Sequence, residues 1–146
     1  MTAIKRSALL PYTSQQMFEL VNHIEDYPRF LPWCSKSHVL YRDDKEVEAS
    51  LELSWSGIHK SFTTRNVLSP FNRIDIHLVH GPFRHLEGIW NFTEMGEGCR
   101  VDLELEFELT GQFFDRIFEP ILHRIANSLV ELFSARAVEV YGYREN

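Results

Sequence analysis

The sequence has 146 residues, of which 44% are hydrophobic and 25% are charged, and its formal net charge is −6. This length and balance favour one folded domain over residues 1–146 and exclude a chain too polar to build a core. The acidic excess excludes a nucleic-acid binder that relies on bulk positive charge, although a local basic patch stays open. We therefore expect no DNA partner.

The apolar runs near the N-terminus and the cysteines indicate in which cellular compartment the protein is expected. Apolar runs reach only a few residues, as in Ala8–Leu10, whereas a membrane span needs about 20. The apolar piece before Pro11 is also too short for a secretory signal, so we expect a cytoplasmic protein without a transmembrane segment, although transient membrane contact stays open. Cys34 and Cys99 are far apart in sequence, and we expect free thiols that pack as small hydrophobic side chains.

The chain begins with a predicted strand and two predicted short helices. Residues 3–10 alternate loosely until Pro11 stops the strand. Thr13 and Gln16 have the spacing of a capping box, and apolar residues follow it at helical spacing: Met17, Phe18, Val21 and Ile24. A second short helix is expected from about Asp26 to Pro32.

Six strands are predicted after Cys34, because the spacing of apolar residues changes to a period of two. Turn residues separate the apolar stretches, which are clearest at 47–55, 74–78, 86–92 and 99–109 and weakest at 58–67. The last strand faces solvent with a row of charged residues, so a slip of one residue would bury that row. Short connections make the sheet antiparallel.

A long amphipathic helix is predicted for residues 113–142, with a break or kink near residues 116–120 caused by Pro120. The fold class is therefore α+β: a curved antiparallel sheet of seven strands, two short helices after the first strand, and one long C-terminal helix. One helix need not fill the trough of a curved sheet, so we expect a ligand cavity between the two.

Several short motifs occur in the same order as in a known family. They are residues 8–13, 18–21, 27–34, 62–66, 81–83 and 135–141, with Leu86, Gly88, Trp90 and Phe92 behind the fifth. Together they cover nearly the whole chain, and 27–34 is the most specific. The sequence resembles the RatA-type ribosome-association toxins and the mitochondrial coenzyme Q-binding proteins, within the START-like superfamily of helix-grip folds, which is also labelled polyketide cyclase/dehydrase.

The resemblance implies two functions of different classes. The coenzyme Q-binding members imply non-enzymatic binding of ubiquinone or a related isoprenoid lipid in support of respiration. The ribosome-association members imply a toxin that binds the large ribosomal subunit and blocks subunit joining. The superfamily label is taken as a name and not as an activity, and we expect no enzyme, because the sequence contains no nucleophile–base or phosphate-binding motif. Catalysis by polar residues such as Tyr12, His38 or Arg65 stays open.

The predicted ligand site combines the helix stripe with the apolar face of the sheet. Its residues are Phe30, Leu31, Trp33, Phe83, Trp90, Leu105, Phe107, Ile121, Ile125, Leu129 and Phe133. Residues 30–33 are predicted either to cover the cavity or to pack as a core edge, and residues 81–83 form either a plain hairpin turn or the cavity mouth. The ligand's head group is expected near these two segments. No cofactor is required, although ubiquinone could be bound.

Other polar clusters are interpreted as ordinary surface. His77, His80 and His85 lack the spacing of a metal site, so no metal is expected. The acidic row at positions 102–108 is interpreted as a solvated outer face, where carboxylates do not converge on one point. The basic residues are scattered and are interpreted as solubilising charge, with a site for ribosomal RNA as the alternative: Lys5, Arg6, Lys60, Arg65 and Arg84.

Overall fold

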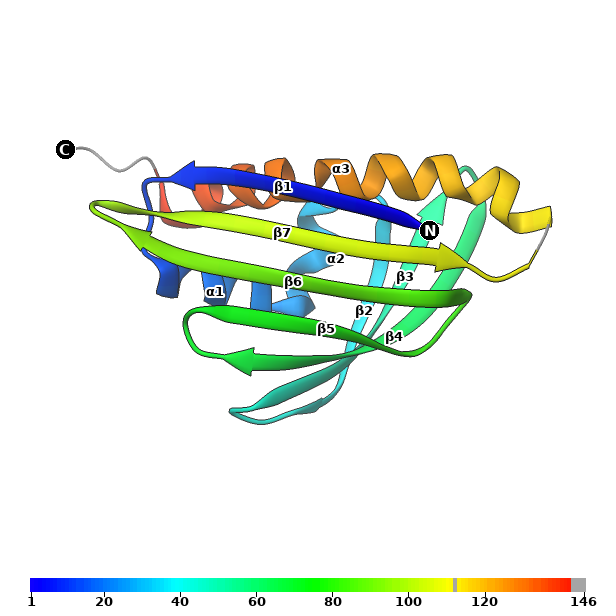
Figure 1. Ribbon diagram of the computed structural model, residues 1–146, viewed down its shortest axis with the longest axis horizontal. Helices are drawn as coiled ribbons and strands as arrows, with labels where there is room; N and C mark the ends of the chain where they lie inside the picture. The colour runs from blue at the N-terminus through cyan, green and yellow to red at the C-terminus, as the bar shows by residue number, and fades with distance from the viewer. Residues whose placement is uncertain (112, 143–146) are drawn as a thin grey trace.

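The structure is a computed structural model that describes residues 1–111 and 113–142, and the side chains of these except residues 113–117. The chain forms one sheet with helices on one of its faces (Figure 1). The elements in chain order are β1 (Thr2–Leu10), α1 (Ser14–Asn22), the 3-10 turn η1 (Ile24–Asp26), α2 (Tyr27–Phe30), β2 (Cys34–Arg42), β3 (Glu46–Trp55), β4 (Ile58–Ser69), β5 (Arg73–His80), β6 (Phe83–Met95), β7 (Gly98–Leu109) and α3 (Phe113–Tyr141).

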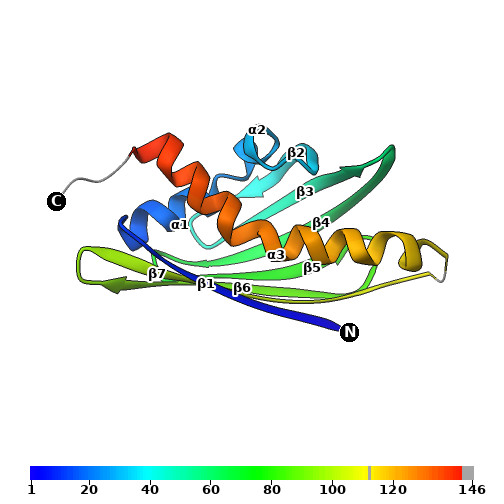
Figure 2. The same cartoon turned by 90° about the horizontal axis from the view of Figure 1, so that it is seen from above.

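The sheet has seven strands in the order β1-β7-β6-β5-β4-β3-β2, and every neighbouring pair is antiparallel. Only the pairing of β1 with β7 joins strands distant in sequence, and it places the N-terminal strand at one edge. Figure 2 shows α1, α2 and α3 on the same face of the curved sheet, with α3 running across it. The predicted fold class and strand number are confirmed.

The N-terminal helices are held by the residues that the sequence indicates, with one boundary moved. Thr13 Oγ1 accepts a hydrogen bond from Gln16 N at 3.0 Å, and Thr13 N donates to Gln16 Oε1 at 2.9 Å, which confirms the capping box. The helix expected to reach Pro32 ends at Phe30 instead. Leu31 has extended backbone angles, because the residue before a proline avoids the helical region.

The inner face of β7 confirms the alternation seen in the sequence. Val101, Leu103 and Phe107 are buried, whereas Glu104 and Glu106 are exposed. Leu103 pairs with Trp90 of β6 and with Arg6 of β1, so the apolar residues of β7 face the helices. This register keeps the acidic row in water.

Of the kink or break predicted near residues 116–120, the break is wrong, since α3 is continuous through Pro120, and the kink stays a prediction. Pro120 is exposed, so water can replace the hydrogen bond that proline removes. The predicted stop at Gly142 is confirmed: its φ is +76°, and its N–H donates to Val138 O at 2.8 Å. Side chains 114 and 117 of the predicted stripe lie outside the described residues.

Within the described residues, no helix is long and apolar enough to cross a membrane.

Candidate functional site

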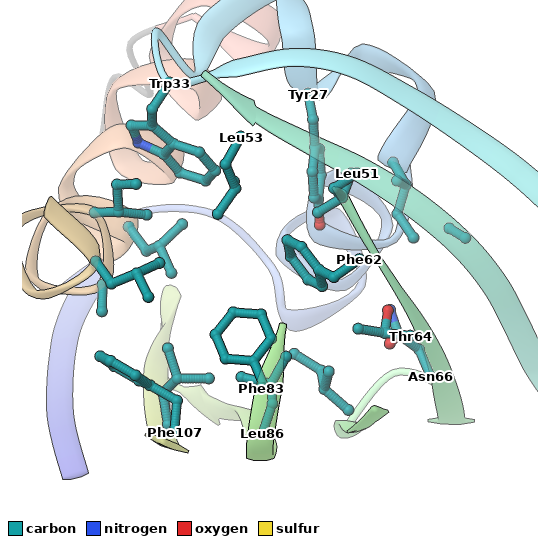
Figure 3. Close-up of a pocket in the computed structure, with 18 of the residues that line it drawn as sticks. Tyr27, Trp33, Leu51, Leu53, Phe62, Thr64, Asn66, Phe83, Leu86 and Phe107 are labelled. Carbon is teal, nitrogen blue, oxygen red and sulfur yellow. The ribbon is translucent and has the colours of Figure 1, made fainter. Parts of the chain in front are cut away.

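A cavity of about 130 Å³ lies between α3 and the sheet, as the sequence analysis expects. Figure 3 shows its lining side chains converging from several strands and from the helices. Apolar residues from β3 to β7 form one wall, among them Leu51, Leu53, Phe62, Ile76, Leu86 and Leu105. The opposite wall comes from one side of α3, with Leu122, Ile125, Ala126, Leu129 and Phe133. Such a lining favours an apolar ligand.

Eight of the eleven predicted site residues line this cavity. They are Trp33, Phe83, Trp90, Leu105, Phe107, Ile125, Leu129 and Phe133, whereas Phe30, Leu31 and Ile121 do not line it. Leu31 is 1% exposed and lies in the core, and Ile121 is half-buried on α3 and packs against the core. The structure thus places the eight around one space, and their role in binding a ligand stays a prediction.

Residues 30–33 form a core edge. The Phe30 ring packs on Phe133, with ring centres 5.2 Å apart, and Phe133 itself lines the cavity. Leu31 and Trp33 are buried, while Pro32 is exposed. Of the two alternatives for this segment, the structure has the packed one, and Trp33 alone among these four residues contributes to the wall.

The turn at residues 81–83 is a hairpin turn that also supplies one wall residue. Gly81 has φ +156°, and a Cβ there would lie 2.6 Å from Phe62 Cβ, so no other residue fits. This close approach sets Phe62 against Phe83, with ring centres 5.5 Å apart, and both rings line the cavity.

The sequence analysis missed the polar part of the wall. Thr64 and Asn66 of β4 line the cavity and are 6% and 8% exposed. They share a face with Phe62, because alternate residues of a strand point to the same side. That spacing could have identified them, but the weak alternation of residues 58–67 gave no reason to choose which face is buried.

Tyr27 is another of the wall residues that the sequence analysis missed. Its hydroxyl donates to Val21 O, and burial raises its pKa above the usual range. The tyrosine is therefore a neutral part of the wall, already hydrogen-bonded within the chain.

Reactive groups are absent from the described lining, which contains no carboxylate, imidazole, amine, guanidinium or thiol. Burial raises the pKa of both Cys34 and Cys99 to about 11, and both are free and buried. Tyr12 donates to Gly142 O at 2.7 Å, and His38 and Arg65 are exposed, so none of the three reaches the cavity. This arrangement suits binding more than acid–base or nucleophilic chemistry.

One group of side chains outside the cavity has the spacing to hold a metal ion. The ligand atoms of His85, Glu87 and Glu106 lie within 4.8 Å of one another, on neighbouring strands β6 and β7. Both glutamates are exposed, and His85 Nε2 lies 3.5 Å from Glu106 Oε2. The sequence analysis grouped His85 with the other histidines and did not foresee the two carboxylates.

The basic residues are spread over the surface. Lys5 Nζ lies 3.5 Å from Glu104 Oε1, and Arg6 donates to Asn127 Oδ1. Arg65 and Arg84 are exposed on different strands, β4 and β6. Exposed pairs such as Lys5–Glu104 contribute little to stability.

The sequence matches a family described as polyketide cyclase / dehydrase and lipid transport over residues 10–134. The chain belongs to this family. It is 42% identical to "Ribosome association toxin RatA" of Pseudomonas aeruginosa over 97% of this chain and 99% of that protein, and 41% identical to the RatA protein of Escherichia coli K12 over 99% and 92%. "Coenzyme Q-binding protein coq10, mitochondrial" of Schizosaccharomyces pombe is 28% identical over 91% and 85%. The resemblance to both groups is confirmed.

Solved structures with the same fold agree with this assignment. Protein CC1736 of Caulobacter crescentus is 31% identical, with a TM-score of 0.75 over 98% of this chain and all of that one. TTHA0849 of Thermus thermophilus has a TM-score of 0.82 at 20% identity, covering 95% and 99%. The Zhui aromatase/cyclase of Streptomyces has a TM-score of 0.81 at 14% identity, covering 93% of each chain, which shows a shared fold alone.

Proposed function

We propose that this protein binds a hydrophobic small molecule without transforming it, in the cavity between α3 and the sheet. The observation that carries the proposal is an apolar cavity of about 130 Å³ walled by both elements. The described lining contains no carboxylate, imidazole, amine, guanidinium or thiol, and its one phenol, Tyr27, is hydrogen-bonded within the chain, which supports binding over catalysis. A quinone or related isoprenoid compound is the ligand class we favour, because a relative is named as a coenzyme Q-binding protein.

The size of the cavity limits what it holds in this conformation. Pockets for drug-sized ligands measure about 300 to 1,000 Å³, so this one takes a ring and excludes a long tail. We propose that the ring enters first and that α3 moves away from the sheet to admit a tail. Each methylene buried there would contribute about 0.8 kcal/mol.

Ligand binding can be tested with the purified protein. Extraction and mass spectrometry should detect a bound isoprenoid or quinone, and adding a quinone to delipidated protein should change the fluorescence of Trp33 and Trp90, which line the cavity. Leu105→Asn puts an amide into the wall and should weaken binding, whereas Leu40→Asn, at an exposed position of β2, should leave binding unchanged. A delipidated protein whose fluorescence does not respond to quinone would contradict the proposal.

A second candidate function is association with the ribosome, in the cytoplasm. It is favoured by identities of 41–42% over nearly the full chain to proteins named ribosome association toxins. The net charge of −6 disfavours binding to RNA through bulk charge, so contacts would involve local basic residues or ribosomal proteins. The two candidates use different parts of the molecule, cavity and surface, and can be tested separately.

Sedimentation tests the second candidate. Protein added to ribosomes should co-migrate with the large subunit in a density gradient, and the bound fraction should fall steeply as salt increases if phosphates are contacted. Protein that stays at the top of the gradient at low salt would exclude ribosome association.

A further inference from the structure

Asn66 presents a buried polar atom with no partner in the chain. Its side chain is 8% exposed, and among the described residues none donates a hydrogen bond to its Oδ1 atom. Buried polar groups are almost always hydrogen-bonded, because leaving one unpaired costs free energy. Since Asn66 lines the cavity, its missing partner can come from a ligand.

The side chains directly opposite Asn66 on the neighbouring strands cannot donate to its Oδ1 atom. Asn66 lies opposite Val47 of β3 and Ile76 of β5, which carry only apolar side chains. Two residues earlier on the same face, Thr64 adds a hydroxyl to the cavity wall. Figure 3 shows Thr64 and Asn66 together at one end of the pocket, with Trp33 at the other. We call Thr64 and Asn66 the polar corner.

The other unpaired buried groups do not form a comparable site. Trp33 Nε1 is buried without a partner in the described chain, but it only donates, and Figure 3 shows apolar Leu53 beside it. Asn22, His85 and Arg136 also have unpaired atoms, but none of them lines the cavity. The polar corner alone combines an acceptor with donors, since a carboxamide and a hydroxyl offer both.

The size of the cavity defines what can meet this corner. An apolar cavity of about 150 Å³ is known to take up benzene, so 130 Å³ suits a single ring. A lone water molecule would find two side chains here, fewer than the roughly three partners that buried waters have. A ring with one hydroxyl group would pack against the apolar walls and donate a hydrogen bond to Asn66 Oδ1.

We infer that the polar corner binds the hydroxyl group of a ring-shaped ligand, such as a phenol or a quinol, which donates a hydrogen bond to Asn66 Oδ1. This inference rests on the proposed function and adds the head-group contact. It places the head group on β4 and not near residues 30–33 or 81–83, where the sequence analysis expects it.

Two ring compounds of nearly equal shape test the polar corner. The dissociation constants of p-cresol and toluene are measured by calorimetry for the full chain. Because the two compounds differ only in the hydroxyl group, the ratio of the constants gives the contribution of that group to binding. Asn66→Leu should reduce the preference for p-cresol about tenfold, and Thr64→Val should reduce it in the same direction. Thr63→Val is the matched control, because Thr63 is buried on the same strand but pairs with Ser50 and does not line the cavity.

The outcomes separate the two proposals. If the wild-type protein binds neither compound, the cavity does not accept ring ligands and the proposed function itself fails. If both compounds bind and the ratio is the same in Asn66→Leu, Thr64→Val and wild type, the polar corner is refuted while the cavity remains a binding site. Circular dichroism of each variant confirms folding, and Thr64→Val, which keeps the shape of the side chain, still decides the question if Asn66→Leu does not fold.

Discussion

At Gly88, the absence of a side chain leaves room for the side chains of Leu105 and Ile76 beneath the cavity. A Cβ at this position would lie 3.0 Å from Leu105 Cδ1 and 3.2 Å from Ile76 Cδ1, and both residues line the cavity. These methyl groups would have to move, and the empty space next to them is the cavity, so they would move into it. A glycine inside the strand therefore preserves room for a ligand.

Gly88→Ala should therefore reduce binding of a ring ligand such as toluene and lower the unfolding free energy by about 1 kcal/mol, as overpacking does. Ile76→Val removes the Cδ1 carbon that collides, so the double variant should regain part of both losses. Calorimetry and urea unfolding measure the two effects. If Gly88→Ala binds the ring ligand as tightly as wild type does, the displaced methyl groups do not move into the cavity.

The ionisation of Glu25 contributes to stability at low pH. The hydrogen bond from Arg42 lowers the pKa of Glu25 to about 2, and Arg42 Nη2 lies 2.9 Å from Glu25 Oε1. Because the folded-state pKa is lowered, this stabilisation is present above about pH 4.5 and is lost as pH falls through 2. The Glu25 side chain is 42% exposed, so we expect less than about 1 kcal/mol.

Glu25→Gln should be less stable than wild type at pH 6.5, and the difference should shrink by pH 2.5. Urea unfolding at both pH values measures this difference in stability. Glu131→Gln, at an exposed position of α3, is the control and should show no such dependence on pH. If the difference in unfolding free energy is equal at both pH values, the hydrogen bond between Glu25 of η1 and Arg42 of β2 does not contribute to stability.

At the scale of elements, Arg136 is one of the contacts that hold the short segment η1–α2 on α3, together with the packing of Tyr27 and Phe30 on Phe133. Its guanidinium lies 3.8 Å from Asp26, 3.0 Å from Glu139 and 5.2 Å from the centre of the Phe30 ring. The side chain is 16% exposed, so these interactions are partly shielded from water. Since α2 carries Tyr27 of the cavity wall, Arg136 also supports the site from outside.

Arg136→Gln should lower the unfolding free energy by about 1–2 kcal/mol, because the charge, the ring contact and part of the aliphatic stem are lost together. Arg124→Gln, an exposed position on the same helix, should change it by less than about 0.5 kcal/mol. Urea unfolding compares the two. Equal losses would show that Arg136 does not fasten α2 to α3.

Periodicity explains which elements could be predicted. Residues 99–109 alternate strictly, and the residues after 113 have helical spacing. Each pattern fits only one secondary structure and one buried face, because any other register would bury charged side chains. In β4 the faces differ less in polarity: Thr63 and Thr64 point to opposite sides and both are buried. The pattern therefore could not show that Thr64 and Asn66 face the cavity.

For the whole molecule, the sequence could predict that α3 and the sheet face each other but not how much space they leave. That volume depends on how side chains from distant elements interlock, and small residues such as Ala49 and Ala126 leave room that their hydrophobicity does not reveal. The same limit applies to Phe30 and Ile121, which are apolar residues of the helices α2 and α3 and yet do not line the cavity.

If the cavity is maintained for a ligand, a side chain that fills it should weaken ligand binding without lowering the stability of the fold. Ala126 of α3 is 2% exposed and lines the cavity, so Ala126→Leu places three more carbons in the empty space. Filling a void typically leaves stability within about 1 kcal/mol of wild type or raises it. We therefore expect at least tenfold weaker binding of toluene or quinone with an unchanged or higher melting temperature.

Ala135→Leu is the matched control, since it makes the same change on the exposed side of α3 and should leave binding unaltered. Wild-type protein at 100 times the dissociation constant of a ligand should gain about 2.7 kcal/mol of stability, a gain that Ala126→Leu should lose and Ala135→Leu should keep. Full binding by Ala126→Leu would show that ligands occupy another site. A large loss of stability would show that the volume beside Ala126 is already occupied by its neighbours and is not available to a ligand.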